Sequence, residues 1–170
     1  MHPKWFGDSF DLVKRYFIEV LSDLNYEVFV DPMITEAWSS KQDEKDFYKL
    51  LKALPVQAIA TTNNPKALLV DPDTGVGKTK KNTHVTIDHI VHLLQSHEIV
   101  FSFDQSFSRS TDQMVQLQSK LEELKRKGCH GFYYDSHARF LFASKSYDVL
   151  RKLEDGLISS GLPKRRLIHL

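Results

Sequence analysis

Four short apolar runs that end in aspartate constrain the fold of this chain more than any other feature. Each is rich in β-branched and aromatic residues, and they occupy residues 28–31, 68–71, 100–104 and 132–135. Runs of this length and composition are typical of buried strands that give way to a loop. Helical patterns separate most of them, and this alternation predicts a parallel sheet with crossover helices.

The other periodicities complete the prediction of a three-layer, Rossmann-like α/β fold. Apolar residues recur at helical spacing at 10–24, 47–54, 86–94, 114–124 and 149–157. The runs at 131–134 and 139–143 flank a short polar turn, which predicts an antiparallel hairpin near the C-terminus of a mainly parallel sheet. Shorter strands are expected at 56–60 and 166–170. Because no repeat or linker interrupts the chain, we expect one domain over residues 1–170.

Composition narrows the class of protein. A hydrophobic content of 41% and a charged content of 26% in 170 residues are typical of a soluble globular chain. No apolar run approaches the roughly 18 residues of a membrane span, and the first residues contain no apolar signal core. The single Cys129 excludes an internal disulfide, so a cytoplasmic location is expected. A net charge of +1 provides no global basic field for nucleic acid.

The strand-ending carboxylates predict a metal site. In a parallel sheet the carboxyl ends of the strands share one edge, where ligands bind. Asp71 and Asp73 follow one strand, and Asp104 and Asp135 end two others. Mg²⁺ prefers one or two carboxylates together with water and phosphate oxygens, so these four residues are the expected ligands of Mg²⁺ or Mn²⁺. The alternative is that Asp-Pro and Asp-Thr-Gly are turn residues after a strand.

Basic residues near these carboxylates suggest a phosphate-containing substrate. Residues 72–79 nearly match a P-loop, but Pro72 stands where that loop needs glycine and has no N–H for a phosphate. Lys78 and Arg109 are therefore predicted to contact the substrate as side chains. The leading hypothesis is a divalent-metal-dependent phosphoesterase, a hydrolase or nuclease acting on nucleic acid or a nucleotide. Asp73 and Asp104 would be catalytic, because a metal there lowers the pKa of a bound water.

The opening of the chain supports an alternative. Residues 7–14, which run through a helix into the strand at 28–31, resemble the opening of Rossmann-fold methyltransferases of the three-Cys-motif partner and rRNA adenine methyltransferase type. A later strand of those families ends in Asp-Pro-Pro-Tyr or Asp-Pro-Phe-Gly, to which residues 69–73 are similar. The resemblance implies a reduced methyltransferase-like protein that binds S-adenosylmethionine or a nucleotide at Asp31 and Asp71. The family's glycine-rich loop is missing, because residues 32–38 contain no glycine.

A third hypothesis is a non-catalytic interaction domain. Aromatic residues dominate the energetics of protein interfaces, and they are also common core residues. The candidates for contact with a protein partner are Trp5, Phe6, Trp38, Tyr133 and Tyr134. The sequence leaves open which partner this would be, the oligomeric state, and whether the chain is an enzyme.

Overall fold

The computed structural model describes residues 2–79, 81, 83–107 and 112–170. Within these residues, the main sheet has seven strands in the order β2-β1-β3-β6-β8-β7-β9. The strands from β2 to β6 in this order are parallel to one another, whereas β8 runs antiparallel to both of its neighbours. The strand bounds are β1 Glu27–Asp31, β2 Leu54–Pro55, β3 Lys66–Val70, β6 Ile99–Phe103, β7 His130–Tyr134, β8 Phe140–Ser144 and β9 Leu167–Ile168.

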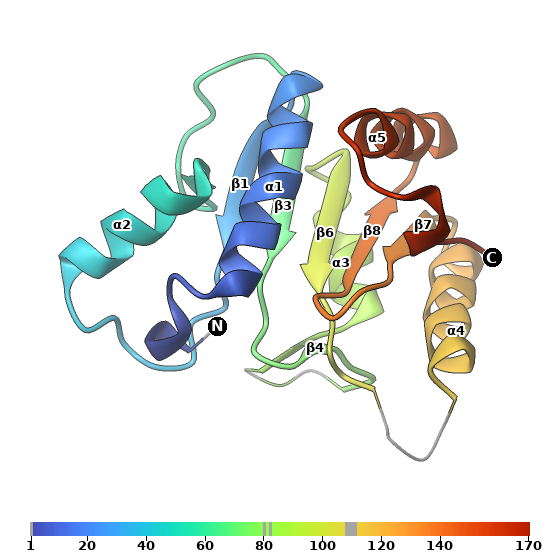
Figure 1. Cartoon of the computed structure of the whole chain (residues 1–170), viewed down its shortest axis with the longest axis horizontal. Helices are drawn as coiled ribbons and strands as arrows, with labels where there is room; N and C mark the ends of the chain where they lie inside the picture. Colours follow the sequence, from blue (N-terminus) through green and yellow to red (C-terminus); the bar gives the residue numbers. More distant parts are fainter. Residues whose placement is uncertain (1, 80, 82, 108–111) are drawn as a thin grey trace.

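Helices cover both faces of this sheet and make three layers (Figure 1). One face carries α1 (Ser9–Asp23), α2 (Lys41–Leu51) and α5 (Tyr147–Ser159), and the other carries α3 (Ile87–Leu93) and α4 (Gln113–Arg126). Short 3₁₀ helices, η1 (Pro3–Trp5) and η2 (Lys164–Arg166), lie near the two ends of the chain. The predicted α/β class, the mainly parallel sheet and the hairpin formed by β7 and β8 are confirmed.

The strands are apolar on both sides because each side packs against helices. On β3, Leu69 belongs to the core under α1 and α5, whereas Leu68 and Val70 belong to the core under α3 and α4. All three side chains are fully buried. This double burial explains why the sequence shows continuous apolar runs rather than an alternation of apolar and polar residues.

The chain reverses its direction of sheet growth between β1 and β3. From β1 it passes through α2 to β2 at one edge, then returns to β3 on the other side of β1 and continues through α3 to β6. At this reversal the ends of the two strands are joined, because the N–H of Asp71 donates to the carbonyl of Asp31 at 2.9 Å. Open α/β sheets bind ligands outside the carboxyl ends of the strands at such a point.

Some predicted elements differ from those observed. The strand expected at 56–60 is absent, and β2 forms two residues earlier, with Leu54 opposite Phe29. Pro55 is tolerated there because β2 is an edge strand, and one side of its backbone needs no partner. The polar segment after β3 contains β4 (Gly75–Val76), which pairs in parallel with β5 (His84–Val85). None of the described helices is long and apolar enough to cross a membrane.

Candidate functional site

A pocket of about 260 Å³ opens at the carboxyl edge of the sheet, beside the reversal between β1 and β3. Its walls come from η1, the first turns of α1, the loop after β3 and the end of β6. Trp5, Phe10 and Phe103 provide aromatic surface, and Asp73 and Gln105 provide polar groups. Phe10 and Phe103 meet edge to face with their ring centroids 5.3 Å apart, whereas Trp5 is 59% exposed at the rim.

The start of α1 is fixed at this edge by its own capping groups. Asp8 caps the helix, and its side chain accepts the backbone N–H groups of Phe10 and Asp11. Asp11 in turn accepts the N–H of Gly7 at 2.8 Å. Three turns later, Phe17 and Leu21 anchor the helix in the core. The first turns of α1 therefore lie at the carboxyl edge as part of a rigid element.

A buried lysine connects α1 to the end of β3. Lys14 Nζ lies 2.8 Å from Asp11 Oδ1 and 2.7 Å from Asp71 Oδ2, and the Lys14 side chain is 6% exposed. Burial disfavours the charged ammonium, but the two carboxylates outweigh burial and raise the pKa of Lys14 above its ordinary value. Burial also raises the pKa of Asp71, although Lys14 opposes this effect. The Lys14 ammonium thus takes the position at Asp71 that the sequence assigned to a metal ion.

The segment after β1 covers the adjoining part of the edge. Asp31 Oδ1 accepts the N–H of Met33 at 3.0 Å, and Met33 has a φ of 43°. Thr35 Oγ1 then donates to Asp73 Oδ2 at 2.7 Å. His2 Nε2 and Glu36 Oε1 lie 3.1 Å apart, which connects this segment to the start of the chain. In place of an open glycine-rich loop, the chain has a segment tied to the loop after β3 and to the N-terminal residues.

Asp104, at the end of β6, is fully buried and accepts hydrogen bonds from four residues. Its Oδ1 accepts the N–H groups of Val76 and Ser106 at 2.9 and 3.0 Å, and the Ser106 hydroxyl, which also reaches the Val76 carbonyl, lies 2.7 Å away. Its Oδ2 accepts Lys120 Nζ at 2.6 Å and the Tyr133 hydroxyl at 2.7 Å. A carboxylate offers about four lone-pair positions, so these donors leave none for a metal ion.

The partners of Asp104 have shifted pKa values. Burial lowers the pKa of Lys120, although Asp104 partly opposes it. Burial and the neighbouring carboxylate raise the pKa of Tyr133 well above its ordinary value. Because Tyr133 is completely buried, it does not contact a protein partner, contrary to the third hypothesis. Its ring packs in the core under α3 and α4.

Asp135 forms a third, separate network. Its Oδ1 accepts Arg139 Nε at 2.8 Å and Gln113 Nε2 at 3.0 Å, and Arg139 also donates to the Gln113 amide oxygen at 2.7 Å. This network joins the start of α4 to the turn between β7 and β8. Asp135 therefore holds two elements together, away from Asp71 and its lysine partner.

The four predicted metal ligands do not assemble around one ion. Among residues 2–79, 81, 83–107 and 112–170, no three His, Cys, Asp or Glu side chains could hold a metal together. Asp71 and Asp73 do share a pocket, whereas Asp104 and Asp135 serve other networks. Lys78 is exposed, and Arg109 lies outside the described residues. Sequence reasoning did not identify Lys14 and Lys120 as the partners of these carboxylates.

Comparison with known proteins adds no identification. No protein-family model, curated protein or solved structure matches this chain significantly.

The chemistry of the pocket follows from its lining. Three carboxylates, those of Asp8, Asp71 and Asp73, line it together with the ammonium of Lys14, which pairs with Asp71. The aromatic side chains make much of the remaining wall apolar. Such a lining suits a flat, apolar ring that carries hydrogen-bond donors, and it repels a phosphate group that no cation accompanies.

Proposed function

We propose that this chain is a methyltransferase-like binding protein that holds a nucleoside-class ligand in the pocket between η1, α1, β3 and β6. One observation carries the proposal: aromatic side chains and the Asp73 carboxylate line one pocket beside the reversal of the sheet. Aromatic rings stack on a nucleobase, and a carboxylate accepts hydrogen bonds from its exocyclic amine. The resemblance of residues 7–14 and 69–73 to Rossmann-fold methyltransferases also supports this class of ligand.

The size and charge of the pocket narrow the ligand further. Sites for drug-sized ligands span about 300–1,000 Å³, and this pocket of about 260 Å³ lies just below that range. It therefore suits a nucleobase or nucleoside more than a complete dinucleotide or polyphosphate. The residues after β1 do not form the glycine-rich loop that would admit the methionine part of S-adenosylmethionine, and Thr35 is bonded to Asp73 there. Asp73 would accept from the base, and Trp5 and Phe103 would flank its ring.

Calorimetry on the whole chain tests this proposal with adenosine, S-adenosylmethionine, S-adenosylhomocysteine and ATP as ligands. Adenosine is expected to bind and ATP to bind more weakly, because its phosphates meet the carboxylates of the lining. Asp73→Asn should weaken the binding of adenosine about tenfold or more, since a hydrogen bond to a charged group contributes roughly 1.5–3 kcal/mol. Trp5→Ala should weaken it by up to about tenfold.

Two variants serve as matched controls. Asp155→Asn removes an exposed carboxylate from α5. Tyr147→Ala removes a ring that is 60% exposed, close to the 59% of Trp5, from a different part of the surface. Neither control should change adenosine affinity. If no nucleoside binds at millimolar concentration, or if the controls weaken binding as much as Asp73→Asn, the proposal is wrong.

The metal-dependent phosphoesterase is the competing proposal, and Asp73 is the carboxylate on which it now depends. The described residues do not fit a metal well, because Lys14 neutralises Asp71 and Asp104 is saturated. Thermal unfolding with and without metal decides between the two proposals. A rise in melting temperature of about 2–4 °C with millimolar Mn²⁺, corresponding to roughly 1 kcal/mol, would favour the phosphoesterase if Asp73→Asn abolishes it.

A further inference from the structure

A groove of about 600 Å³ lies at the amino edge of the sheet, away from the pocket beside Asp71. Its walls come from the end of α2, the start of β1, β2 and the exposed loop over residues 61–64. The ring of Tyr48 and the side chains of Leu54 and Pro55 make part of the wall apolar. The volume of the groove lies within the range of about 300–1,000 Å³ that is typical of small-ligand sites.

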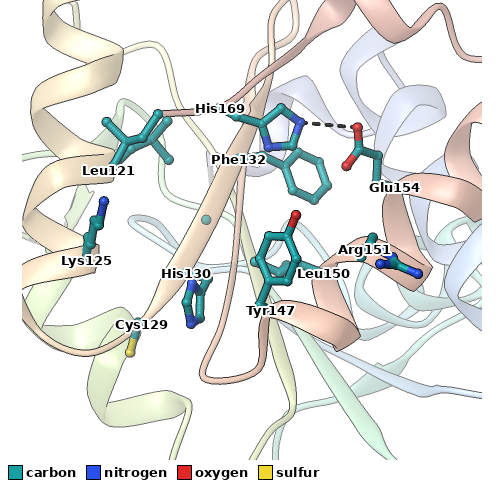
Figure 2. A pocket seen from close by; sticks show the side chains of 12 residues that line it. Leu121, Lys125, Cys129, His130, Phe132, Tyr147, Leu150, Arg151, Glu154 and His169 are labelled. Carbon is teal, nitrogen blue, oxygen red and sulfur yellow. Dashed lines mark hydrogen bonds and ion pairs between the residues drawn. The ribbon is translucent and has the colours of Figure 1, made fainter.

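The carboxylate of Glu27, which lines this groove, has one oxygen without a partner. Glu27 is the first residue of β1 and is 9% exposed. Its Oε1 accepts the hydroxyl of Thr61 and, at 2.8 Å, the N–H of the same residue. Its Oε2 is buried, and no hydrogen-bond donor among the described residues reaches it. By contrast, the carboxylate of Glu154 in the pocket at the start of β7 lies 3.2 Å from His169 Nε2 (Figure 2).

The carboxyl group of Glu27 is ionised at neutral pH. The hydrogen bonds from Thr61 are the main reason why the pKa of Glu27 lies below its ordinary value, and the nearby Thr62 lowers this pKa further. A buried carboxylate oxygen without a donor costs free energy, and a ligand that brings a donor removes this cost. Thr62 is exposed, so its side chain can change rotamer and open Oε2 to such a ligand.

Two hydrogen-bond donors on α2 that line the groove also lack partners. Within the described residues, the Tyr48 hydroxyl makes no hydrogen bond and Lys49 makes no ion pair. Burial raises the pKa of Tyr48 to about 12, so its hydroxyl keeps its proton. Lys52, the other cation of the lining, already lies 2.8 Å from Glu19 Oε1. The groove therefore combines an unpaired carboxylate oxygen on β1 with two unpaired donors on α2.

These charges distinguish between the possible classes of ligand. A divalent metal ion has no ligand set here, because no group of three His, Cys, Asp or Glu side chains in the described part of the chain could hold one. A polyamine would be repelled by Lys49 and Lys52, and an anion without a positive group would be repelled by Glu27. A zwitterion brings an opposite charge to each side.

We propose that this groove binds a free α-amino acid with an apolar side chain. The ammonium group would donate to Glu27 Oε2, and the carboxylate would accept from Lys49 and from the Tyr48 hydroxyl. The apolar side chain would pack against Leu54 and Pro55. Both charged groups of the ligand thus meet an opposite charge, and the buried oxygen of Glu27 gains a donor.

Isothermal titration calorimetry on the whole chain tests this proposal with L-leucine as the probe. L-leucine should bind, and two analogues that each lack one charged group, isopentylamine and isocaproate, should bind at least severalfold more weakly. Glu27→Gln should weaken L-leucine binding about tenfold or more, because a hydrogen bond between two charged groups is lost. Lys49→Gln changes an exposed residue and should weaken binding severalfold.

Lys45→Gln and Glu122→Gln are the controls, because each removes a charge from an exposed position outside the groove. Neither should change the affinity for L-leucine, and neither should Asp73→Asn, because Asp73 lines the other pocket. Equal binding of isopentylamine or isocaproate would overturn the roles assigned to the two charged groups, and equal weakening by a control would overturn the site. If L-leucine, L-valine and L-phenylalanine all fail to bind at millimolar concentration, an amino acid is not the ligand.

Discussion

Asp71 and Asp104 end neighbouring strands of one sheet, and both are buried beside a lysine, but their surroundings differ. Asp71 borders a pocket, and its partner Lys14 is shared with Asp11. Asp104 has no exposed surface and accepts hydrogen bonds from four residues, Val76, Ser106, Lys120 and Tyr133. The same residue type at the same edge thus borders a binding pocket in one case and joins structural elements in the other.

The hydrogen-bond donors around a strand-ending carboxylate, rather than its position at the sheet edge, decide what it does. The amide of Val76, the hydroxyl of Tyr133 and the ammonium of Lys120 use the lone pairs of Asp104, so it holds β4, β7 and α4 against β6. Asp71, although buried, lines the pocket together with its partner Lys14.

Asp104→Ala should have the largest effect on stability. It leaves Lys120 and the Tyr133 hydroxyl without their buried acceptor, and loss of one partner from a buried ion pair costs about 3–5 kcal/mol. Asp71→Ala should lower the free energy of unfolding less, by roughly 1–3 kcal/mol, because Lys14 keeps its ion pair with Asp11. Urea unfolding of both variants measures the two free energies. Equal losses would remove the contrast between the two carboxylates.

A pair of glycines tests the same contrast through the backbone. Gly75 has a φ of +110°, and a Cβ there would lie 2.4 Å from Asp104 Oδ1 and 2.6 Å from Asp104 Cα. Gly7, at the start of α1, has a φ of +84° but nothing within 4 Å of such a Cβ. Gly75→Ala should therefore cost about 2–4 kcal/mol and Gly7→Ala about 1–2 kcal/mol. Similar values from chemical denaturation would contradict a tightly packed Asp104 network.

Lys14 and Lys120 should titrate on opposite sides of 10.5, the ordinary pKa of a lysine side chain. Acetylation by acetic anhydride, followed by mass spectrometry across a pH series, reports each side chain relative to the urea-unfolded protein. The midpoint for Lys120 should lie below 10.5, because burial lowers its pKa, and that for Lys14 above it, because Asp71 and Asp11 raise its pKa. Midpoints in the reverse order would show that the two environments are wrongly assigned.

The signs of the linked stability changes follow from these shifts. A raised folded-state pKa means that the contribution of Lys14 is complete below 10.5 and is lost as pH rises through the folded value. For Lys120 the unfolded chain binds more protons between the lowered folded value and 10.5, so its contribution to stability increases with pH in that window.

The sequence predicted the sheet better than the site. Apolar runs such as 68–70 predict buried strands because burial on both faces leaves a strong signal, and the hairpin follows from two such runs around a short turn. The strand predicted at 56–60 is wrong because Pro55 is typical of the end of a helix, whereas here it lies in the edge strand β2, which tolerates proline. Strand order alone predicts that the four aspartates converge. It does not show which cations and hydroxyl groups contact them.

Those partners left a detectable but ambiguous signal. Lys14 follows Phe10 by four residues and precedes Phe17 by three, so it lies on the apolar stripe of α1, where a charge needs a partner. Lys120 lies three residues after Leu117 and one before Leu121, at the border of the stripe of α4. The spacing shows that a charge is placed inward, but which carboxylate it meets depends on tertiary packing.

The position of β8 affects how the chain can be made. β8 lies between β6 and β7 but follows both in the sequence. During synthesis, β6 and β7 are therefore complete before the strand that joins them exists. Until residue 144 is available, both strands present open edges of the kind that pair with other chains. β8 is thus the last strand to enter the interior of the sheet, and it pairs with the free edges of β6 and β7. Factors that delay the 140–144 segment would prolong the time during which these edges can pair with other chains and aggregate.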